Sequence, residues 1–452
     1  MEYLGPAVWL KTSVGASKTE SSSAIIRSWR TTYDAPYRSQ TGQPAGSADL
    51  PILIVGAGTG NDVSAALRAG SRAIDAVEID PTIVQLGRWA HPEQPYADPR
   101  VRVIVDDARS FFAKTPRRYG KAIFGFLDSH TLMSSFSSLR LDNFVYTRES
   151  MERVKALLVP GGMVAVTFAA HTTWLHERMI ALLDSVFDAP TLVLSQTDGP
   201  RYSNGIVYLN WKASQTGPAG PPQALRSGAQ TSTLLPTDDW PFLYLQHRTV
   251  PVHYRVFMAM VMLMGLGGLW LLPSGERRVK APYFLMGAAF FLIETSNVVA
   301  LSLLYGSTWM VNTAVFAGIL VLILLGNLTA MRRSGTSVLG LFILLWVGLG
   351  ISYIVRPAML LGIEPWWLKG VAAVVVFLGP VYLASVIFAQ LIKRETHLAQ
   401  AYGSNLLGAV MGGACEYLSM VMGLRWLLLL TSAFYVLAFV SLLPSRKAGR
   451  LA

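Results

Sequence analysis

A short apolar run followed by closely spaced glycines constrains this chain more than any other feature of its sequence. Residues 52–55 are all Ile, Leu or Val, which is typical of a parallel strand buried on both faces. Three glycines follow at once, Gly56, Gly58 and Gly60. Glycine at such a turn lets the backbone bend sharply and approach a ligand closely. A helix over 62–68 and a second strand over 73–79 come next, and that strand carries Glu78 to its carboxyl end. This order predicts a nucleotide-type cofactor pocket.

The spacing of the glycines distinguishes two classes of cofactor. A dinucleotide fingerprint, GxGxxG, requires glycine at position 61, where this chain has Asn61. GxGxG followed by an acidic strand end instead favours S-adenosylmethionine or a close relative. Glu78 lies eighteen residues after Gly60, where a carboxylate can accept both hydroxyls of a ribose. We therefore expect S-adenosylmethionine or its decarboxylated form as the cofactor, bound by the glycine turn and Glu78.

Acidic residues also stand at the ends of the third and fourth predicted strands. Asp107 follows the strand at 101–105 and is suited to hold the amino group of adenine. Asp128 follows the strand at 121–127, at the edge where doubly wound sheets place their chemistry. Each acid could instead cap the helix that comes after it, as we expect for Asp80. We favour ligand contact for the strand-end acids, because independent caps need not recur at the carboxyl ends of successive strands.

The composition changes abruptly near residue 250. Residues 1–250 carry 24 Lys and Arg against 22 Asp and Glu, whereas residues 251–452 carry 14 against 5 and are otherwise mostly apolar. The formal charge of +11 therefore lies mainly in the second part. There the basic residues punctuate apolar runs too long for a soluble core, which argues against nucleic acid as a partner and predicts insertion into a lipid bilayer.

Seven apolar stretches in the second part are candidates for membrane-spanning helices. Most reach the roughly 20 residues needed to cross a bilayer, and tryptophans stand at several of their ends, where such rings favour the interface. The predicted spans are residues 256–272, 282–304, 309–330, 338–355, 366–391, 402–422 and 426–443. The only cysteine, Cys415, leaves neither a disulfide framework nor a cysteine-based metal site, and we expect no metal.

The basic loop residues conflict with the expected orientation. With seven crossings, the loops opposite the α/β domain hold ten Lys and Arg and those on its own side hold five. The positive-inside rule would then place the domain outside the cytoplasm, where adenosyl cofactors are not made. The stretch at 256–272 is the weakest candidate for a full crossing and contains three glycines. We therefore expect that it lies in the membrane interface or re-enters the bilayer without crossing it. We place the domain on the cytoplasmic side of a bacterial inner membrane.

Composition and strand pattern divide the chain into four parts. We expect a polar segment over 1–49, an α/β doubly wound domain over 50–212, a linker and membrane-surface segment over 213–250, and an all-α polytopic membrane domain of about seven helices over 251–452. Asp239 and Trp240 lie in the surface segment. They either cap the approach to the first span or form part of a substrate mouth at the membrane surface.

Residues from about 50 to 210 resemble the spermidine synthase family, aminopropyltransferases with the S-adenosylmethionine-dependent transferase fold. The matching motifs are the glycine turn, the strand end VEID, Asp107 with Ala108, Asp128 with Ser129, and Tyr146 with Thr147. The membrane-fused bacterial members are similar also at residues 128–147, 237–245 and 403–419. The resemblance implies a membrane-anchored enzyme that transfers an aminopropyl or methyl group to an amine or lipid-like acceptor. The alternative is a non-catalytic sensor or transporter-like protein that binds an adenosyl ligand.

Two departures from the family pattern bear on the acceptor. Soluble spermidine synthases carry an acid within the glycine turn, where this chain has Thr59, and a second acid shortly after Asp128, which is missing here. A diamine cation must be held and must lose a proton, and both needs favour carboxylates, so putrescine is not the expected acceptor. Asp128 remains available as a base or an amine-orienting group. His130 is either a substitute proton acceptor or a hydrogen-bonded loop histidine, and Thr59 and Tyr146 are candidate substrate-binding residues.

Glu294 and Glu416 fall close to the middle of the second and sixth predicted spans. A charged side chain there costs about 2.5–3.5 kcal/mol on insertion scales, so both should face the interior of the bundle. One interpretation is a neutral acid hydrogen-bonded to Asn297, Asn405 or a backbone carbonyl. The other is a shared polar cavity that accepts a cationic amine or a lipid head group.

Overall fold

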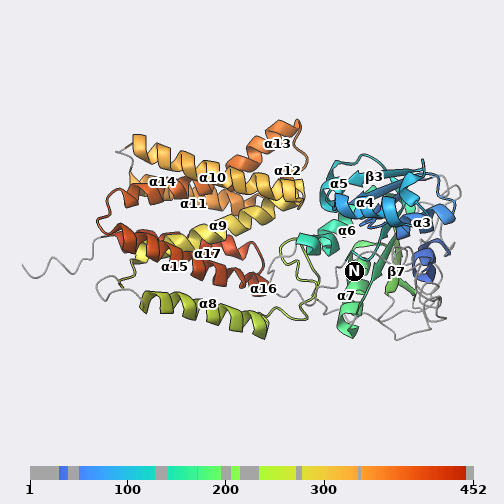
Figure 1. Cartoon of the computed structure of the whole chain (residues 1–452), viewed down its shortest axis with the longest axis horizontal. Helices are drawn as coiled ribbons and strands as arrows, with labels where there is room; N and C mark the ends of the chain where they lie inside the picture. Colours follow the sequence, from blue (N-terminus) through green and yellow to red (C-terminus); the bar gives the residue numbers. More distant parts are fainter. Residues whose placement is uncertain are drawn as a thin grey trace, which may run out of the picture. The chain divides into compact units, whose positions relative to one another are not determined.

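The computed structural model describes residues 30–38, 50–127, 141–170, 172–194, 205–213, 234–270, 277–333 and 337–443. The chain divides into two compact units, Met1–His247 and Arg248–Ala452. The first is an α/β unit and the second is helical (Figure 1). This confirms the predicted succession of a doubly wound α/β domain and an all-α region.

A seven-stranded sheet in the order β3-β2-β1-β4-β5-β7-β6 forms the centre of the first unit. The strands are β1 Ile52–Val55, β2 Ile74–Glu78, β3 Val101–Val105, β4 Tyr119–Phe124, β5 Leu158–Phe168, β6 Leu192–Leu194 and β7 Ile206–Trp211. Strands β1 to β5 each pair in parallel with their neighbours among them, and the first four are the strands predicted from the sequence. β7 runs antiparallel to both β5 and β6. The order reverses direction between β1 and β4, which is the switch point where doubly wound sheets bind ligands.

Helices cover both faces of this sheet. They are α3 Asn61–Arg68, α4 Pro81–Ala90, α5 Ala108–Lys114, α6 Arg148–Leu157 and α7 Thr173–Val186, with short turns η3 Pro95–Ala97 and η5 Leu141–Tyr146. On one face Val63 of α3 and Val84 of α4 join a hydrophobic core with Ile54 of β1. On the other face, Phe111 of α5 and Met151 of α6 pack in a second core. Residues 30–38 are helical and add side chains to the first of these cores.

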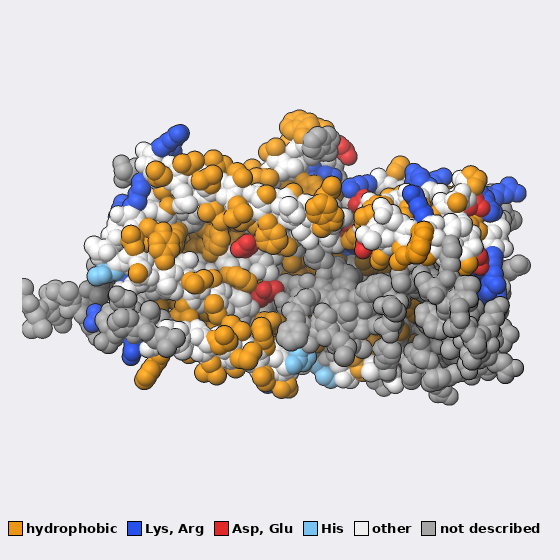
Figure 2. Space-filling view, viewed as in Figure 1, with side chains coloured by type: hydrophobic (Ala, Val, Ile, Leu, Met, Phe, Trp, Pro, Cys, Tyr) orange, Lys and Arg blue, Asp and Glu red, His pale blue; other side chains and the backbone are white. Residues whose placement is uncertain are grey.

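The second unit is built from long apolar helices. They are α8 Val252–Trp270, α9 Ala281–Tyr305, α10 Trp309–Arg332, α11 Val338–Ile354, α12 Pro357–Leu360, α13 Trp366–Ala373, η6 Val374–Leu378, α14 Gly379–Ile392, α15 Leu398–Glu416, α16 Ser419–Met422 and α17 Trp426–Leu442. Among the described residues, three helices are long and apolar enough to cross a bilayer, Ala281–Tyr305, Trp309–Arg332 and Trp367–Ile392. Figure 2 shows hydrophobic side chains over much of the visible face of this unit, with acidic side chains among them.

The sixth predicted span differs from the observed structure. α15 begins at Leu398, before the predicted start, because polar residues such as Gln400 join the helix although they lower the local hydropathy. It ends at Glu416, and the chain continues through a tight turn in which the N–H of Leu418 donates to the carbonyl of Cys415. Glu416 is therefore the last residue of α15 and does not lie in the middle of a helix.

α9 and α15 run parallel to each other and pack unusually closely through glycine. A Cβ atom added to Gly408 would lie 1.9 Å from the carbonyl oxygen of Phe284, and one added to Gly287 would lie 2.0 Å from that of Asn405. The amide of Asn405 also donates to the carbonyl of Tyr283 at 3.2 Å. The two backbones therefore approach to a distance that only a hydrogen atom on Cα allows, as is common where helices associate in a bilayer.

We predict that Gly408→Ala destabilises the helical unit, because its new methyl group would overlap the backbone of α9. Overpacking of this kind costs about 1–3 kcal/mol, which corresponds to a loss of roughly 3–10 °C in Tm for a unit of this size. Gly403→Ala on the same helix is the matched control, since nothing lies within 4 Å of its Cβ position. Thermal unfolding of the purified protein in detergent measures both, and equal Tm values for the two variants would contradict the close packing.

Candidate active site

The glycine turn after β1 adopts backbone angles that other residues rarely reach. Gly56, Gly58 and Gly60 have φ values of 67°, 55° and 106°. Gly56 is also tightly covered, because a Cβ there would lie 1.7 Å from Cδ2 of Leu127. The turn is held from its other side by Tyr96, whose hydroxyl donates to the carbonyl of Gly58 at 2.6 Å. Backbone N–H groups of the turn are thus fixed at the carboxyl end of β1, beside the start of α3.

Glu78 accepts backbone hydrogen bonds from two turns, the glycine turn after β1 and the turn after β2. It is the last residue of β2 and is buried. Its Oε2 accepts from the N–H of Gly58 at 2.8 Å, and its Oε1 accepts from the N–H of Asp80 at 3.0 Å. Burial raises the pKa of Glu78, and the backbone donors oppose that shift. The two carboxylate oxygens together offer about four lone-pair sites, more than the backbone donors occupy, so the fixed group can still accept a ligand hydroxyl.

Two apolar side chains stand exposed at the same edge of the sheet. Ile79 follows Glu78 and is 43% exposed, and Val105 at the end of β3 is 52% exposed. Val105 is the register partner of Glu78. Asp107 lies two residues further on and is buried, with its Oδ1 accepting from the N–H of Ser110 at 3.1 Å. An apolar ledge between two buried carboxylates suits a flat, partly apolar ligand such as a nucleoside.

Helix capping accounts for part of the acidic pattern. Asp80 accepts from the N–H of Thr82 at 2.7 Å, which confirms the cap predicted for it. Asp107 caps α5 in the same way, so this carboxylate serves the helix at the strand end where ligand contact is predicted. The sequence did not single out Ile79, Val105 or Tyr96. The first two carry a usable signal, an apolar residue beside an acid at the end of a parallel strand.

Of the other site residues predicted for the α/β unit, two lie outside the described residues and two are buried. Asp128 and His130 lie outside the described residues. Thr59 is buried within the glycine turn, at 3% exposure. Tyr146 is buried too, with its ring edge-on to Phe168 at a centroid distance of 5.4 Å, so packing accounts for its position.

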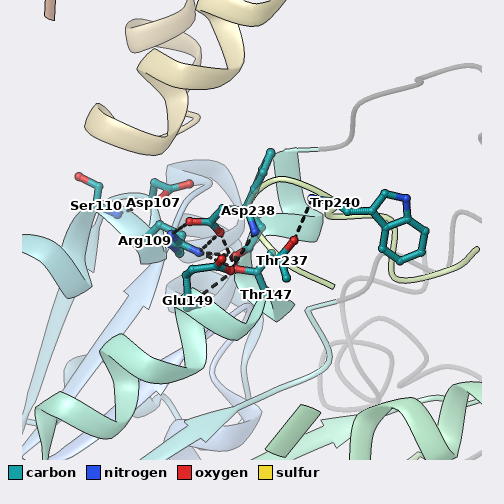
Figure 3. A network of polar contacts seen from close by, with 10 residues as sticks. Asp107, Arg109, Ser110, Thr147, Glu149, Thr237, Asp238 and Trp240 are labelled. Carbon is teal, nitrogen blue, oxygen red and sulfur yellow. Dashed lines mark hydrogen bonds and ion pairs between the residues drawn. The ribbon is translucent and has the colours of Figure 1, made fainter. Parts of the chain in front are cut away.

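A network of polar contacts fixes the segment that carries Asp238 and Trp240 (Figure 3). Arg109 donates to both carboxylate oxygens of Asp238, at 2.8 and 2.7 Å. Thr147 donates to Asp238 Oδ1 at 2.7 Å, and the N–H of Asp238 donates to Glu149 at 2.8 Å. The segment is thereby tied to α5 and α6 of the α/β unit.

Trp240 completes this attachment by burial. Its side chain is 1% exposed and lies edge-on to Phe242 at 5.7 Å. The guanidinium of Arg178 stands over its ring at 5.8 Å and donates to the carbonyls of Leu243 and Leu245. Asp239 is partly buried in the same turn. These contacts favour an anchoring role for the segment over a substrate mouth.

Glu294 and Glu416 lie at matching depth on two adjacent helices. Phe291 of α9 packs against Gly413 of α15, and one turn further along the parallel helices come the two acids. Both side chains are partly buried. Asn297, one turn beyond Glu294, is 2% exposed, and its Nδ2 has no hydrogen-bond partner among the described residues. In the described part of the chain, no group of three or more His, Cys, Asp or Glu is placed to hold a metal ion.

Comparison with known proteins gives partial matches. No protein-family model matches the chain. A polyamine aminopropyltransferase of Korarchaeum cryptofilum is 26% identical over 171 residues, 35% of this chain and 49% of its own length. Polyamine aminopropyltransferase 2 of Pseudomonas aeruginosa is 30% identical over 147 residues, 30% of this chain and 39% of its own. Among solved structures, a probable spermidine synthase from Corynebacterium glutamicum matches at 21% identity and a TM-score of 0.31, over 41% of this chain and 63% of that one.

The chain is similar to the polyamine aminopropyltransferases. This confirms the predicted resemblance to the spermidine synthase family. The parallel strands β1 to β5 with helices on both faces form the doubly wound α/β fold that the sequence predicts, and β7 adds an antiparallel strand beside β5. The chain spans less than half the length of the curated relatives that it matches.

We predict that Asp238→Ala destabilises the α/β unit by about 2–3 kcal/mol, because it leaves the partly buried guanidinium of Arg109 without its carboxylate. Arg148→Ala is the control, since its ion pair with Glu152 is half exposed on both sides and is worth about 0–0.5 kcal/mol. Denaturant unfolding followed by tryptophan fluorescence compares the two variants. A loss for Asp238→Ala no greater than that for Arg148→Ala would contradict the anchoring role.

Proposed function

We propose that this protein is a membrane-anchored transferase that uses S-adenosylmethionine or decarboxylated S-adenosylmethionine. The observation that carries the proposal is the edge formed by the glycine turn, the fixed Glu78 carboxylate and the exposed pair Ile79 and Val105. The turn would hold the charged tail of the ligand, Glu78 the ribose hydroxyls, and the apolar pair one face of the adenine, with Asp107 at its amino group. Similarity to the polyamine aminopropyltransferases supports the same ligand class.

The reaction needs little from the protein beyond placement and proton transfer. The bound cofactor supplies a sulfonium carbon that a nucleophile attacks in line, with the thioether as leaving group. Asp128 follows β4 in the sequence, and in this proposal it orients the acceptor amine and takes its proton, with His130 as a second proton acceptor. Placing the acceptor in line with the sulfonium carbon is the main catalytic contribution.

The acceptor is an amine or an amine-bearing, lipid-like molecule. Thr59 in the glycine turn carries no charge, which disfavours putrescine. The three helices that are long and apolar enough to cross a bilayer in the described part of the chain would bring the transferase to a membrane, with its α/β unit in the cytoplasm where adenosyl cofactors are made. Glu294 and Glu416, at matching depth on α9 and α15, would line a polar path for a cationic acceptor within the helical unit.

Ligand binding tests the cofactor assignment. Isothermal titration of the full-length protein in detergent should give binding of S-adenosylmethionine or its decarboxylated form and none of NAD. Glu78→Gln should weaken that binding by roughly tenfold or more, because a charge-assisted hydrogen bond to the ribose is lost. Glu93→Gln, which alters an exposed ion pair with Arg68, is the control and should leave affinity unchanged. Binding of NAD alone would show that the cofactor assignment is wrong.

Turnover tests the role of Asp128. Asp128→Asn should lower kcat by roughly 10²–10⁴, the range for removal of a general base, while cofactor affinity stays within about twofold of wild type. The readout is single-turnover transfer to a panel of amines and aminolipids. Full turnover by the variant on an acceptor that the wild type uses would remove Asp128 from the mechanism.

A further inference from the structure

Asp62 is a buried carboxylate at the switch point of the sheet. It lies in the first turn of α3 and is 5% exposed. A Cβ atom added to Gly125 would lie 2.5 Å from its Oδ2 and 3.4 Å from the carbonyl oxygen of Gly56. Gly125 directly follows β4, and Gly56 directly follows β1. The carboxylate therefore stands between the carboxyl ends of the two strands at which the sheet order reverses, which is where ligands bind in this architecture.

The helix at residues 30–38 brings aromatic side chains to this carboxylate. Tyr33 meets Phe126 edge-on at a centroid distance of 6.1 Å. Burial, followed by the negative charge of Asp62, raises the pKa of both Tyr33 and Tyr37, so both phenols lie within electrostatic reach of the acid. The hydroxyl of Tyr37 is buried and has no hydrogen-bond partner among the described residues. A carboxylate with aromatic rings around it is the chemistry that recognises an ammonium group.

No Lys, Arg or His of the described residues forms an ion pair with Asp62, although ion pairs surround it. Arg68 on the same helix is bonded to Asp34 at 2.7 Å and to Glu93 at 2.5 Å. Burial raises the pKa of Asp62 to about 7. A buried carboxylate without a cation is costly to keep, and a ligand that brings its own positive charge would remove that cost.

We propose that Asp62 binds the ammonium group of the acceptor amine, with Tyr33 and Tyr37 as the walls of the site. The proposal rests on the transferase function proposed above and assigns its substrate class as a cationic amine. Asp62 then supplies the negative charge that Thr59 does not provide in the glycine turn, and it does so from the side of β4, where the acceptor and Asp128 are expected. Adenosyl-cofactor binding does not depend on it.

Other titratable groups lie around Asp62. Tyr33, Tyr37 and Tyr96 have raised pKa values and remain neutral near pH 7. Burial lowers the pKa of His91 to about 4, so this side chain is neutral there as well. Charged groups on the packed elements include the acids Asp34, Glu78 and Glu93 and the bases Arg30, Arg68 and Arg88. Lys121, over the ring of Tyr37 at 5.1 Å, has a pKa lowered by burial to about 8 and is the second group that titrates in this range.

Amine binding as a function of pH tests the proposal. Putrescine and spermidine are titrated into the full-length protein in detergent at about pH 6 and about pH 8. Aliphatic ammonium groups stay protonated over this range, whereas Asp62 loses its proton near pH 7. The affinity of at least one amine should therefore rise several-fold from the lower to the higher pH. Asp62→Asn should lower that affinity by roughly tenfold or more at the higher pH and abolish the rise.

Two further measurements separate binding from packing. Asp62→Asn removes an unpaired buried charge, so its Tm at about pH 8 should equal or exceed that of wild type. Asp34→Asn breaks the ion pair between helix 30–38 and α3 and should leave amine affinity unchanged. The proposal is overturned if the wild-type protein binds neither amine or if Asp62→Asn binds the amines as tightly as wild type does. It is also overturned if amine binding by Asp62→Asn still rises with pH, which would point to Lys121 as the titrating group, or if Asp34→Asn weakens binding as much as Asp62→Asn does. Failure of the wild-type protein to bind either adenosyl cofactor would instead overturn the proposed function.

Discussion

The α/β site depends on the two backbone hydrogen bonds that Glu78 accepts. One fixes the glycine turn after β1 and the other fixes the turn after β2, so a single carboxylate sets the spacing of two strand ends. The glycine angles, the hydroxyl of Tyr96 and the exposed ledge of Ile79 and Val105 are all arranged around that group. A site built this way is held by backbone atoms, so its shape depends little on the neighbouring side chains.

The two units solve the packing problem in different ways. The α/β unit buries large side chains such as Trp211 and Trp240 in sheet and loop contacts, and polar pairs such as Arg109 with Asp238 secure its edges. The helical unit gains little from hydrophobic burial if lipid surrounds it. The close approach of the α9 and α15 backbones then contributes more to its packing. The contact between α9 and α15 places Glu294 and Glu416 at the same level along two parallel helices.

Local pattern predicted the parallel strands and the glycine turn because apolar runs and glycine act over a few residues. Local pattern did not predict that β7 runs antiparallel to β5, since the pairing of these strands joins residues about 40 apart in the chain. The ion-pair partner of Asp238 could not be predicted from local pattern either, because Arg109 lies 129 residues away in the chain. Asp62 escaped notice for a different reason: an acid in the first turn of a helix is ordinarily a favourable helix end, and only the fold places it against Gly125.

The proposed function depends on one chemical event, the consumption of an adenosyl sulfonium at this site. The most direct measurement is mass spectrometry of the nucleoside released when the full-length protein is incubated with both cofactors and a mixture of polyamines and aminolipids. A transferase should give acceptor-dependent release of 5′-methylthioadenosine, the thioether left by aminopropyl transfer, or of S-adenosylhomocysteine, the one left by methyl transfer. Binding of either cofactor with no nucleoside product from any acceptor would contradict the proposed function and identify the protein as an adenosyl-ligand sensor.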